Sequence, residues 1–173
     1  MILARWLLPD EVFPDFRKVT PELLRDRGIR FIFSDIDNTL ATYDDPVPPP
    51  DVLAWCRAME EAGIRVAFVS NNDRERVEGF NADLGCPAYW KAAKPLLRTL
   101  RRAMRETGAS PGESLLLGDQ LLTDAAAGKR AGMTVFVVPP IKDKTTLFWR
   151  IKRRIERPYM REFARRKSAR ERK

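Results

Sequence analysis

Short apolar runs alternate with amphipathic segments along most of the chain. The apolar runs predict buried β-strands at 29–34, 66–69, 88–90, 114–117 and 134–138. Helical patterns bounded by capping residues, prolines and glycines predict helices at 21–28, 51–62, 73–85, 94–106 and 125–131. Asp51 is the predicted cap of the second helix, and Lys94-Pro95 is the predicted start of the fourth. This alternation of strands and helices is typical of an α/β fold with a mainly parallel central sheet.

The pattern divides the chain into three segments. Residues 1–28 are an apolar and helical lead-in, residues 29–141 carry the alternating elements, and residues 142–173 form a basic tail. A length of 173 residues suits one such domain. No run reaches the roughly 18 apolar residues of a membrane span. The apolar start is interrupted at Pro9 and Asp10, so we predict a cytoplasmic protein without a signal peptide.

Polar side chains follow the predicted strands directly. Ligands bind beyond the carboxyl ends of the strands in a parallel sheet, so polar residues at these ends predict one shared site. These residues are Asp35 and Asp37, Ser70, and Asp119 and Asp124, with Lys94 on the same side of the sheet.

Carboxylates brought together at this edge repel one another unless a divalent cation lies among them. The chain has no histidine, and its two cysteines lack metal-binding spacing. The absence of histidine excludes catalysis by imidazole, and oxygen-only ligands favour Mg²⁺. Carboxylates also act as nucleophiles towards phosphorus, and a lysine with a hydroxyl group neutralises and orients phosphoryl oxygens. The residue types therefore favour Mg²⁺-dependent phosphoryl chemistry.

The order of these residues resembles the four motifs of the haloacid dehalogenase (HAD) superfamily of phosphatases over roughly residues 29–138. The matching motifs are Asp35-x-Asp37-Asn38-Thr39, Ser70 after an apolar run, Lys94-Pro95, and Gly118-Asp119-x-x-x-x-Asp124. The resemblance implies a Rossmann-like three-layer sandwich and a phosphomonoester hydrolase that forms an aspartyl-phosphate intermediate. Asn38 departs from the pattern, because many members of the superfamily have glycine there.

The resemblance also implies a role for each site residue. Asp35 is the expected nucleophile and a metal ligand. Asp37 is the expected general acid and then base, and it also offers its backbone carbonyl to the metal. Asp119 and Asp124 are expected to complete the Mg²⁺ site. The expected phosphate-binding residues are Thr39, Ser70, Asn71 and Lys94.

The spacing of the motifs leaves no room for the cap domain of many superfamily members. Only 30 residues separate Thr39 from Ser70, and 23 separate Ser70 from Lys94. An open site of this kind favours large substrates. Leu8-Pro9, the Asp-Ile-Asp-Asn-Thr-Leu motif and Ser70-Asn71-Asn72 are similar to the YqeG-type branch of subfamily IIIA. That branch is similar to mitochondrial phosphatidylglycerophosphate phosphatases, which implies phosphatidylglycerophosphate as the leading substrate.

The tail carries the positive charge of the chain. It has 14 Lys and Arg against four Asp and Glu, whereas the rest has 18 basic and 20 acidic residues. Its pattern predicts a basic amphipathic helix on an anionic membrane surface, which implies a peripheral location at the inner membrane face. Pro158 predicts a break or kink, and the last ten residues or so are expected to be disordered. The apolar stripe consists of Leu147, Ile151, Ile155, Tyr159 and Phe163.

Several alternatives remain open at this level. Each site residue also has a structural interpretation, such as a helix cap for Ser70, a surface position for Lys94 or a turn for Asn71. The stripe of the tail could instead pack on the domain. Two other functions are a phosphatase for nucleotides or nucleic-acid ends, and a non-catalytic protein bound to ribosomes or membranes. The sequence leaves the oligomeric state open.

Overall fold

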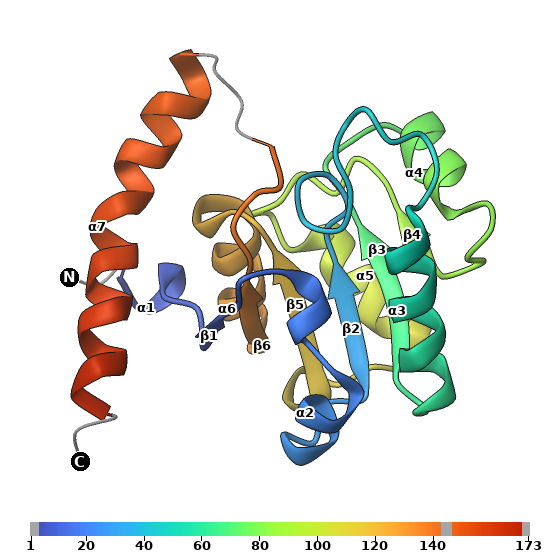
Figure 1. Ribbon diagram of the computed structural model, residues 1–173, viewed down its shortest axis with the longest axis horizontal. Coiled ribbons are helices and arrows are strands. Elements are labelled where there is room, and N and C mark those ends of the chain that lie inside the picture. Colours follow the sequence, from blue (N-terminus) through green and yellow to red (C-terminus); the bar gives the residue numbers. More distant parts are fainter. Residues whose placement is uncertain (1–3, 143–146, 171–173) are drawn as a thin grey trace.

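A parallel sheet forms the centre of the computed structural model, which describes residues 4–142 and 147–170. Its six strands lie in the order β1-β6-β5-β2-β3-β4, and every neighbouring pair is parallel (Figure 1). The strands are β1 (Glu11–Val12), β2 (Phe31–Ser34), β3 (Arg65–Val69), β4 (Ala88–Tyr89), β5 (Ser114–Gly118) and β6 (Thr134–Val137). The predicted α/β class is therefore confirmed.

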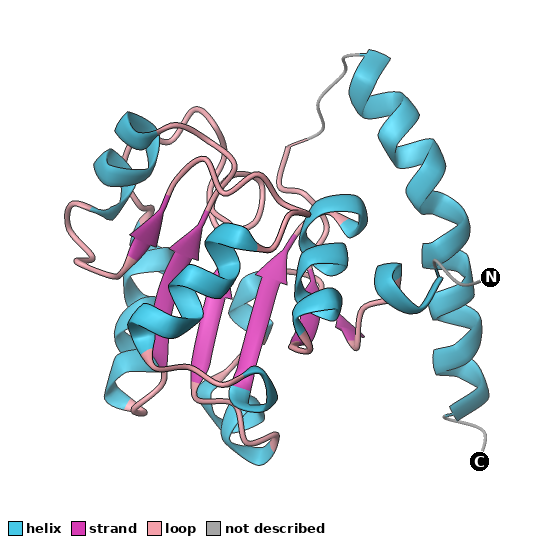
Figure 2. Ribbon diagram, turned by 180° about the vertical axis from the view of Figure 1, so that it is seen from behind, coloured by secondary structure: helices cyan, strands magenta, loops and turns pink. Residues whose placement is uncertain are grey.

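Helices cover both faces of this sheet (Figure 2). One face packs against α2 (Pro21–Asp26), α3 (Pro50–Glu61) and α4 (Arg74–Asn81), and the other against α5 (Arg98–Thr107) and α6 (Ala126–Ala131). Strand β2 contributes side chains to the hydrophobic cores on both faces of the sheet. Ile32 belongs to the first core, on the face of α2, α3 and α4, and Phe31 and Phe33 belong to the second core, on the face of α5 and α6. All four of its residues are buried, as expected of a central parallel strand.

Three details of the predicted elements need correction. Helix α3 begins at Pro50 with Pro49 at the N-cap position, so Asp51 lies in the first turn and is not the cap. A proline at the first helical position already has the helical φ angle. Lys94-Pro95 does not open α5, because both residues lie in a turn before the helix, which begins at Arg98 with Leu97 at its N-cap position. The short elements α1 (Ala4–Leu7) and β1 were not predicted.

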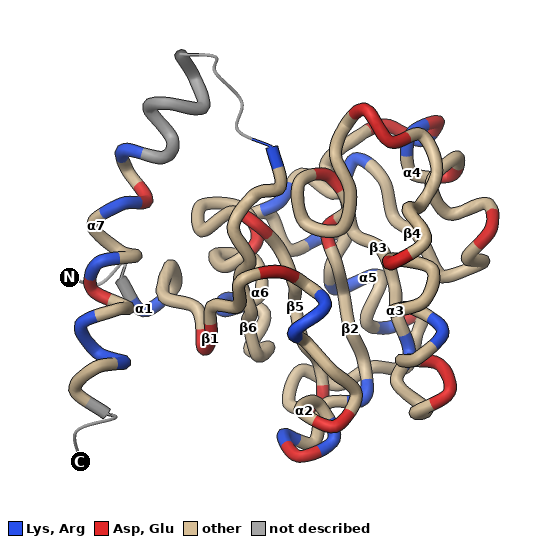
Figure 3. Tube along the Cα trace, in the orientation of Figure 1, with Lys and Arg blue, Asp and Glu red and all other residues tan. Residues whose placement is uncertain are grey.

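The described part of the tail contains the helix α7 (Leu147–Arg170), beside the β1 edge of the sheet (Figure 1). It continues through Pro158, so the predicted interruption is not a break, and residues 164–170 are helical where disorder was expected. Tyr159 and Met160 pack against the second core, which supports the helix past the proline. The structure does not describe the side chains of Leu147 and Ile151, the first two residues of the predicted stripe. Basic residues recur along α7 (Figure 3).

The helices in the described part of the chain include none long and apolar enough to cross a membrane. Within residues 4–142, the interval from Thr39 to Ser70 holds only loops, α3 and β3, and the interval from Ser70 to Lys94 holds only loops, α4 and β4. The site at the carboxyl ends of the strands therefore has no inserted cap domain, as the spacing predicted.

Candidate active site

The carboxyl ends of three neighbouring strands bring the predicted residues together. Asp35 follows β2, Ser70 follows β3, and Asp119 follows β5, and each of these side chains is buried. The register explains the convergence, because Ser34 pairs with Phe68 of β3 on one side and with Leu117 of β5 on the other. Buried polar side chains at this one edge indicate a built site, since charged groups are rarely buried without partners.

Asp35, Asp119 and Asp124 form a cluster of three carboxylates whose oxygen atoms lie within 4.8 Å of one another. Burial raises the pKa of Asp35 to about 6, and the neighbouring Asp124 and Asp37 add to the effect while Lys94 opposes it. Burial likewise raises the pKa of Asp119 well above its ordinary value, with Asp124 and Asp35 contributing. The cluster therefore holds more negative charge than its surroundings compensate. A divalent cation with oxygen ligands fits this donor set.

Lys94 is the cation of the cluster. Its Nζ atom lies 3.0 Å from Oδ1 of Asp35 and 2.7 Å from Oδ1 of Asp124. Burial alone would lower the pKa of Lys94, but the charges of Asp124 and Asp35 raise it above its ordinary value, so the side chain is an ammonium ion. The backbone N–H of Lys94 donates to Oδ1 of Asn71 at 2.7 Å, and Nδ2 of Asn71 donates to the Lys94 carbonyl at 3.1 Å. Asn71 thus holds the loop of Lys94 in place.

Asp124 reaches the cluster from the π-helical turn Leu121–Ala125 after β5. Its Oδ2 atom accepts a hydrogen bond from the backbone N–H of Gln120 at 3.1 Å, and Nε2 of Gln120 donates to Asp119 at 2.9 Å. Gly118 leaves the space for this arrangement, because a Cβ atom at that position would lie 2.4 Å from Cγ of Asp124. Gly118 and Gln120 therefore support the position of the cluster. Both lie within the sequence motif, but their roles were not predicted from it.

The turn after Asp37 has the backbone geometry that its sequence permits. Asn38 has φ = 65°, in the left-handed region that glycine and asparagine tolerate best. This geometry explains how asparagine substitutes here for the glycine of related motifs. The side chain of Asn38 also accepts a hydrogen bond from the backbone N–H of Lys142 at 3.2 Å. The buried hydroxyl of Thr39 has no hydrogen-bond partner among the described residues.

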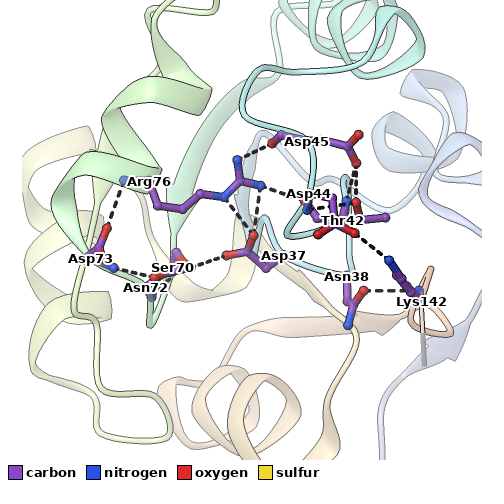
Figure 4. A network of polar contacts seen from close by, with 10 residues as sticks. All are labelled: Asp37, Asn38, Thr42, Asp44, Asp45, Ser70, Asn72, Asp73, Arg76 and Lys142. Atoms are coloured by element: carbon purple, nitrogen blue, oxygen red, sulfur yellow. Dashed lines mark hydrogen bonds and ion pairs between the residues drawn. The ribbon is translucent and has the colours of Figure 1, made fainter. Parts of the chain in front are cut away.

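Asp37 does not join the carboxylate cluster, and its side chain has separate partners (Figure 4). Oδ1 of Asp37 lies 3.0 Å from Nε and 2.9 Å from Nη2 of Arg76, and Oδ2 accepts from Nδ2 of Asn72 at 3.1 Å. The Arg76 side chain is 13% exposed and that of Asp37 is 5% exposed, so this ion pair is largely shielded from water. Arg76 and Asn72 together fix the direction of the Asp37 carboxylate.

Arg76 was not identified from the sequence. It also donates to the carbonyl of Thr42 at 3.0 Å and to the carbonyl of Asp45, and so fastens the loop that follows Asp37. A signal for it was present, because Arg76 lies in the first turn of α4, after its cap Asp73. The helix dipole disfavours a cation there, so an arginine at that position suggests an anionic partner elsewhere.

Ser70 does not cap α4, which corrects the alternative interpretation of this residue, and it lies with Asn72 in the turn that follows β3. The Ser70 hydroxyl accepts from the backbone N–H of Asn72 at 3.0 Å, and the cap of α4 is Asp73, whose carboxylate accepts from the N–H of Arg76. Ser70 remains at the end of β3 and can still donate its hydroxyl proton to an anion. Asn72 combines its turn with the contact to Asp37.

Comparison with known proteins agrees with this geometry. Residues 3–132 match the family of haloacid dehalogenase-like hydrolases. The chain belongs to this family, and it is a phosphatase of the HAD type. It is 37% identical to the probable phosphatase YqeG of Bacillus subtilis (strain 168) over 156 residues, which cover 90% of this chain and 91% of that protein.

Two further likenesses are more distant. The chain is 26% identical to the chloroplastic/mitochondrial phosphatidylglycerophosphate phosphatase 1 of Arabidopsis thaliana over 164 residues, which cover 88% of this chain and 47% of the relative. The cobalt-bound deoxy-D-mannose-octulosonate 8-phosphate phosphatase of Haemophilus influenzae superposes with a TM-score of 0.53 and 21% identity. That match covers 68% of this chain and 70% of the other. This structural likeness concerns the fold alone.

Proposed function

We propose that this phosphatase hydrolyses phosphomonoesters with Mg²⁺ as cofactor and Asp35 as the nucleophile. The supporting observation is the position of Asp35 at the end of the central strand, within the carboxylate cluster and 3.0 Å from the ammonium of Lys94. The ammonium can neutralise an incoming phosphoryl group that the carboxylates alone would repel. Thr39 and Ser70 supply nearby hydroxyl donors, whereas the side chain of Asn71 acts through the loop of Lys94.

The reaction proceeds in two displacements. First, a carboxylate oxygen of Asp35 attacks phosphorus and the bond to the ester oxygen breaks, while protonated Asp37 gives its proton to the departing alkoxide. Then Asp37 takes a proton from water, the resulting hydroxide displaces phosphate from Asp35, and both carboxyl groups return to their starting states. Arg76 and Asn72 hold the ionised form of Asp37, the form that takes the proton from water, in one orientation.

Asp35, Asp119 and Asp124 are the side chains that would hold the metal ion, together with the backbone carbonyl of Asp37. Bound there, Mg²⁺ supplies positive charge that offsets the repulsion between the nucleophile and the phosphoryl oxygens. Lys94 places its ammonium between Asp35 and Asp124 and so shares this role. Oxygen ligands without nitrogen or sulfur support Mg²⁺ over zinc or iron.

The leading substrate is phosphatidylglycerophosphate, at the cytoplasmic face of the membrane. Two observations support a phospholipid: the similarity to the plant phosphatidylglycerophosphate phosphatase, and the basic helix α7, which suits an anionic surface. The absence of a cap domain leaves the site open to a large substrate. The same basic helix also supports a second candidate, a phosphatase for nucleotides or nucleic-acid ends. We do not retain the non-catalytic alternative, because the chain belongs to a phosphatase family.

Phosphate release from a substrate panel tests this assignment. The panel contains phosphatidylglycerophosphate in mixed micelles, an aryl phosphate, a nucleoside monophosphate and a 5′-phosphorylated oligonucleotide, each with Mg²⁺ and with chelator. We expect Mg²⁺-dependent release with the highest kcat/KM for the lipid. Preference for the oligonucleotide or nucleotide would assign the second candidate. Equal release in chelator would contradict the role of the metal.

A further inference from the structure

A largely apolar pocket of about 490 Å³ adjoins the carboxylate cluster. Its walls come from the β1 region, the end of β6 and the loop after it, the π-helical turn and α7. Most lining side chains are apolar, among them Phe13, Leu121, Val138 and Met160, and the charged Arg157 of α7 also lines the pocket. Pockets of this volume, with mainly apolar walls and a few polar groups, are typical of small-molecule sites.

The pocket and the candidate active site share Asp119. Asp119 and Gln120 line the pocket, and Asp119 is also a member of the carboxylate cluster. A group bound through its phosphate at Asp35 therefore has this space beside it. On the other side, Glu156 and Met160 of α7 line the pocket, and Glu156 accepts a hydrogen bond from the backbone N–H of Leu122 at 3.1 Å. That contact fastens α7 to the turn carrying Asp124.

We propose that this pocket is the subsite for the apolar organic part of the phosphate ester, and that α7 forms one of its walls. The inference rests on the proposed function, because the ester must be held at Asp35. Asp119 belongs to both the pocket lining and the carboxylate cluster. We therefore infer that the occupant is the substrate of this chain and not an unrelated ligand. The ligand class is the phosphate monoester of an alcohol with an apolar chain. Helix α7 then contributes to substrate selectivity through the pocket wall, in addition to its positive charge.

A series of n-alkyl phosphates tests the subsite. The measurement is kcat/KM for methyl to octyl phosphate with Mg²⁺, all at concentrations below micelle formation. We expect kcat/KM to rise by roughly three- to fourfold for each methylene group that enters the pocket, up to a plateau where the pocket is full. In Met160→Trp, which places a larger side chain in the wall, the ratio of octyl to methyl values should fall at least about tenfold, a loss of two to three methylene contacts.

Ile155→Trp is the matched control, because Ile155 lies on the same helix but is exposed and does not line the pocket. Its chain-length ratio should equal that of the wild type. A flat chain-length profile in an active wild-type enzyme would overturn the subsite, and so would equal profiles in wild type and Met160→Trp. Release from no ester at all would instead count against the proposed function. The wild-type series alone decides the matter if Met160→Trp does not fold.

A second inference rests on different contacts, those of Arg76. Its guanidinium is largely buried against Asp37 and also binds the carbonyls of Thr42 and Asp45 (Figure 4). We infer that Arg76 is a positioning residue that aims the Asp37 carboxyl group at the leaving oxygen. Alkoxides need a proton as they leave, whereas phenolates with electron-withdrawing groups leave without one. Misplacing Asp37 therefore affects the two ester classes unequally.

The test compares kcat/KM for an alkyl phosphate and for an activated aryl phosphate in Arg76→Met. We expect the alkyl value to fall by at least about tenfold and the aryl value to fall much less. Arg76→Lys should recover part of the alkyl loss, because it keeps a cation beside Asp37. The control is Arg74→Met, an exposed neighbour whose partner is Glu78. Equal losses on both esters, or no loss on either, would overturn the positioning role, and Arg76→Lys provides the comparison if Arg76→Met does not fold.

Discussion

The surroundings of Asp35 are better suited to a protein that has a phosphoryl group and a metal ion bound than to the protein without them. Its carboxylate is buried beside Asp124 and Asp119, and the ammonium of Lys94 offsets only part of this charge. These conditions raise the pKa of a carboxyl group in the absence of metal. The residues that serve the chemistry are therefore expected to reduce the stability of the metal-free fold.

The first prediction concerns Asp35→Asn in chelator. The pKa of Asp35 rises from 3.8 in the unfolded chain to about 6 in the folded protein, so the folded state binds more protons between these values. Stability from this group is therefore lost as the pH rises from about 4 to 6. Asparagine has no such titration, so the melting temperature of the variant should exceed that of the wild type above pH 6. The gain corresponds to on the order of 3 kcal/mol.

Thermal melts at pH 4.5 and pH 7 check this sign. The difference between Asp35→Asn and wild type should grow with pH in chelator and shrink when Mg²⁺ is added to the wild type. A difference independent of pH would mean that Asp35 is adequately neutralised by Lys94 alone.

At the scale of elements, the turn after β5 shows how closely backbone and site are matched. Gly118 ends β5, and the turn Leu121–Ala125 then directs Asp124 back over it. The space for Asp124 exists only because Gly118 has no Cβ atom. Close approach of a side chain to the backbone is thus the reason for glycine at this position, since its backbone conformation is not left-handed.

Gly118→Ala should displace Asp124 from the cluster. The added Cβ atom would lie 2.4 Å from Cγ of Asp124, a contact that side chains cannot tolerate without movement. We expect a loss of about 1–3 kcal/mol in stability and a higher Mg²⁺ concentration for half-maximal activity. Gly112→Ala is the control, because a Cβ atom there meets nothing within 4 Å. Unchanged Mg²⁺ dependence in Gly118→Ala would show that Asp124 is not needed for the metal.

Some elements could be predicted from the sequence because local pattern and tertiary environment agree. The run that forms β2 is apolar on both faces, and its burial follows directly. Strand β1 could not be predicted, because two residues contain no period. The start of α5 was placed too early, because the backbone of Lys94 is held by hydrogen bonds to the side chain of Asn71, a contact between distant residues that local composition does not show.

The features of the candidate site likewise differ in how far the sequence could predict them. Asp35, Asp119 and Asp124 stand in one ordered motif pattern, so their convergence followed from the parallel sheet. Arg76 lies 39 residues from Asp37 in the chain, and no local pattern connects them. The pocket beside Asp119 depends on the position of α7, which sequence periodicity could not give.

At the scale of the whole molecule, the net positive charge and the candidate active-site residues lie on different parts of the chain. The body is nearly neutral and α7 is strongly basic (Figure 3). Contacts join the two, because Lys167 of α7 lies 2.7 Å from Glu11, and Lys142, before the helix, pairs with Asp44 near the active site. Helix α7 is therefore held against the body, and its residues Glu156 and Met160 line the pocket that Asp119 also lines.

Binding to vesicles that contain anionic phospholipid tests the role of this surface. Arg154→Glu with Arg161→Glu should weaken binding strongly, since each basic residue near such a surface contributes about 1 kcal/mol. High salt should weaken wild-type binding likewise. The control is Arg98→Glu with Arg101→Glu on α5, which changes the net charge equally. Equal weakening by both pairs would mean that net charge, and not α7, governs binding.

The most direct test of the central claim is to identify the phosphorylated residue. Wild-type enzyme is mixed with substrate and Mg²⁺, quenched in acid, digested and examined by mass spectrometry. We predict one phosphoryl group on the peptide that contains Asp35, and neither this adduct nor phosphate release in Asp35→Asn. Phosphate release that persists in Asp35→Asn, or a phosphoryl group on another residue, would contradict nucleophilic catalysis by Asp35.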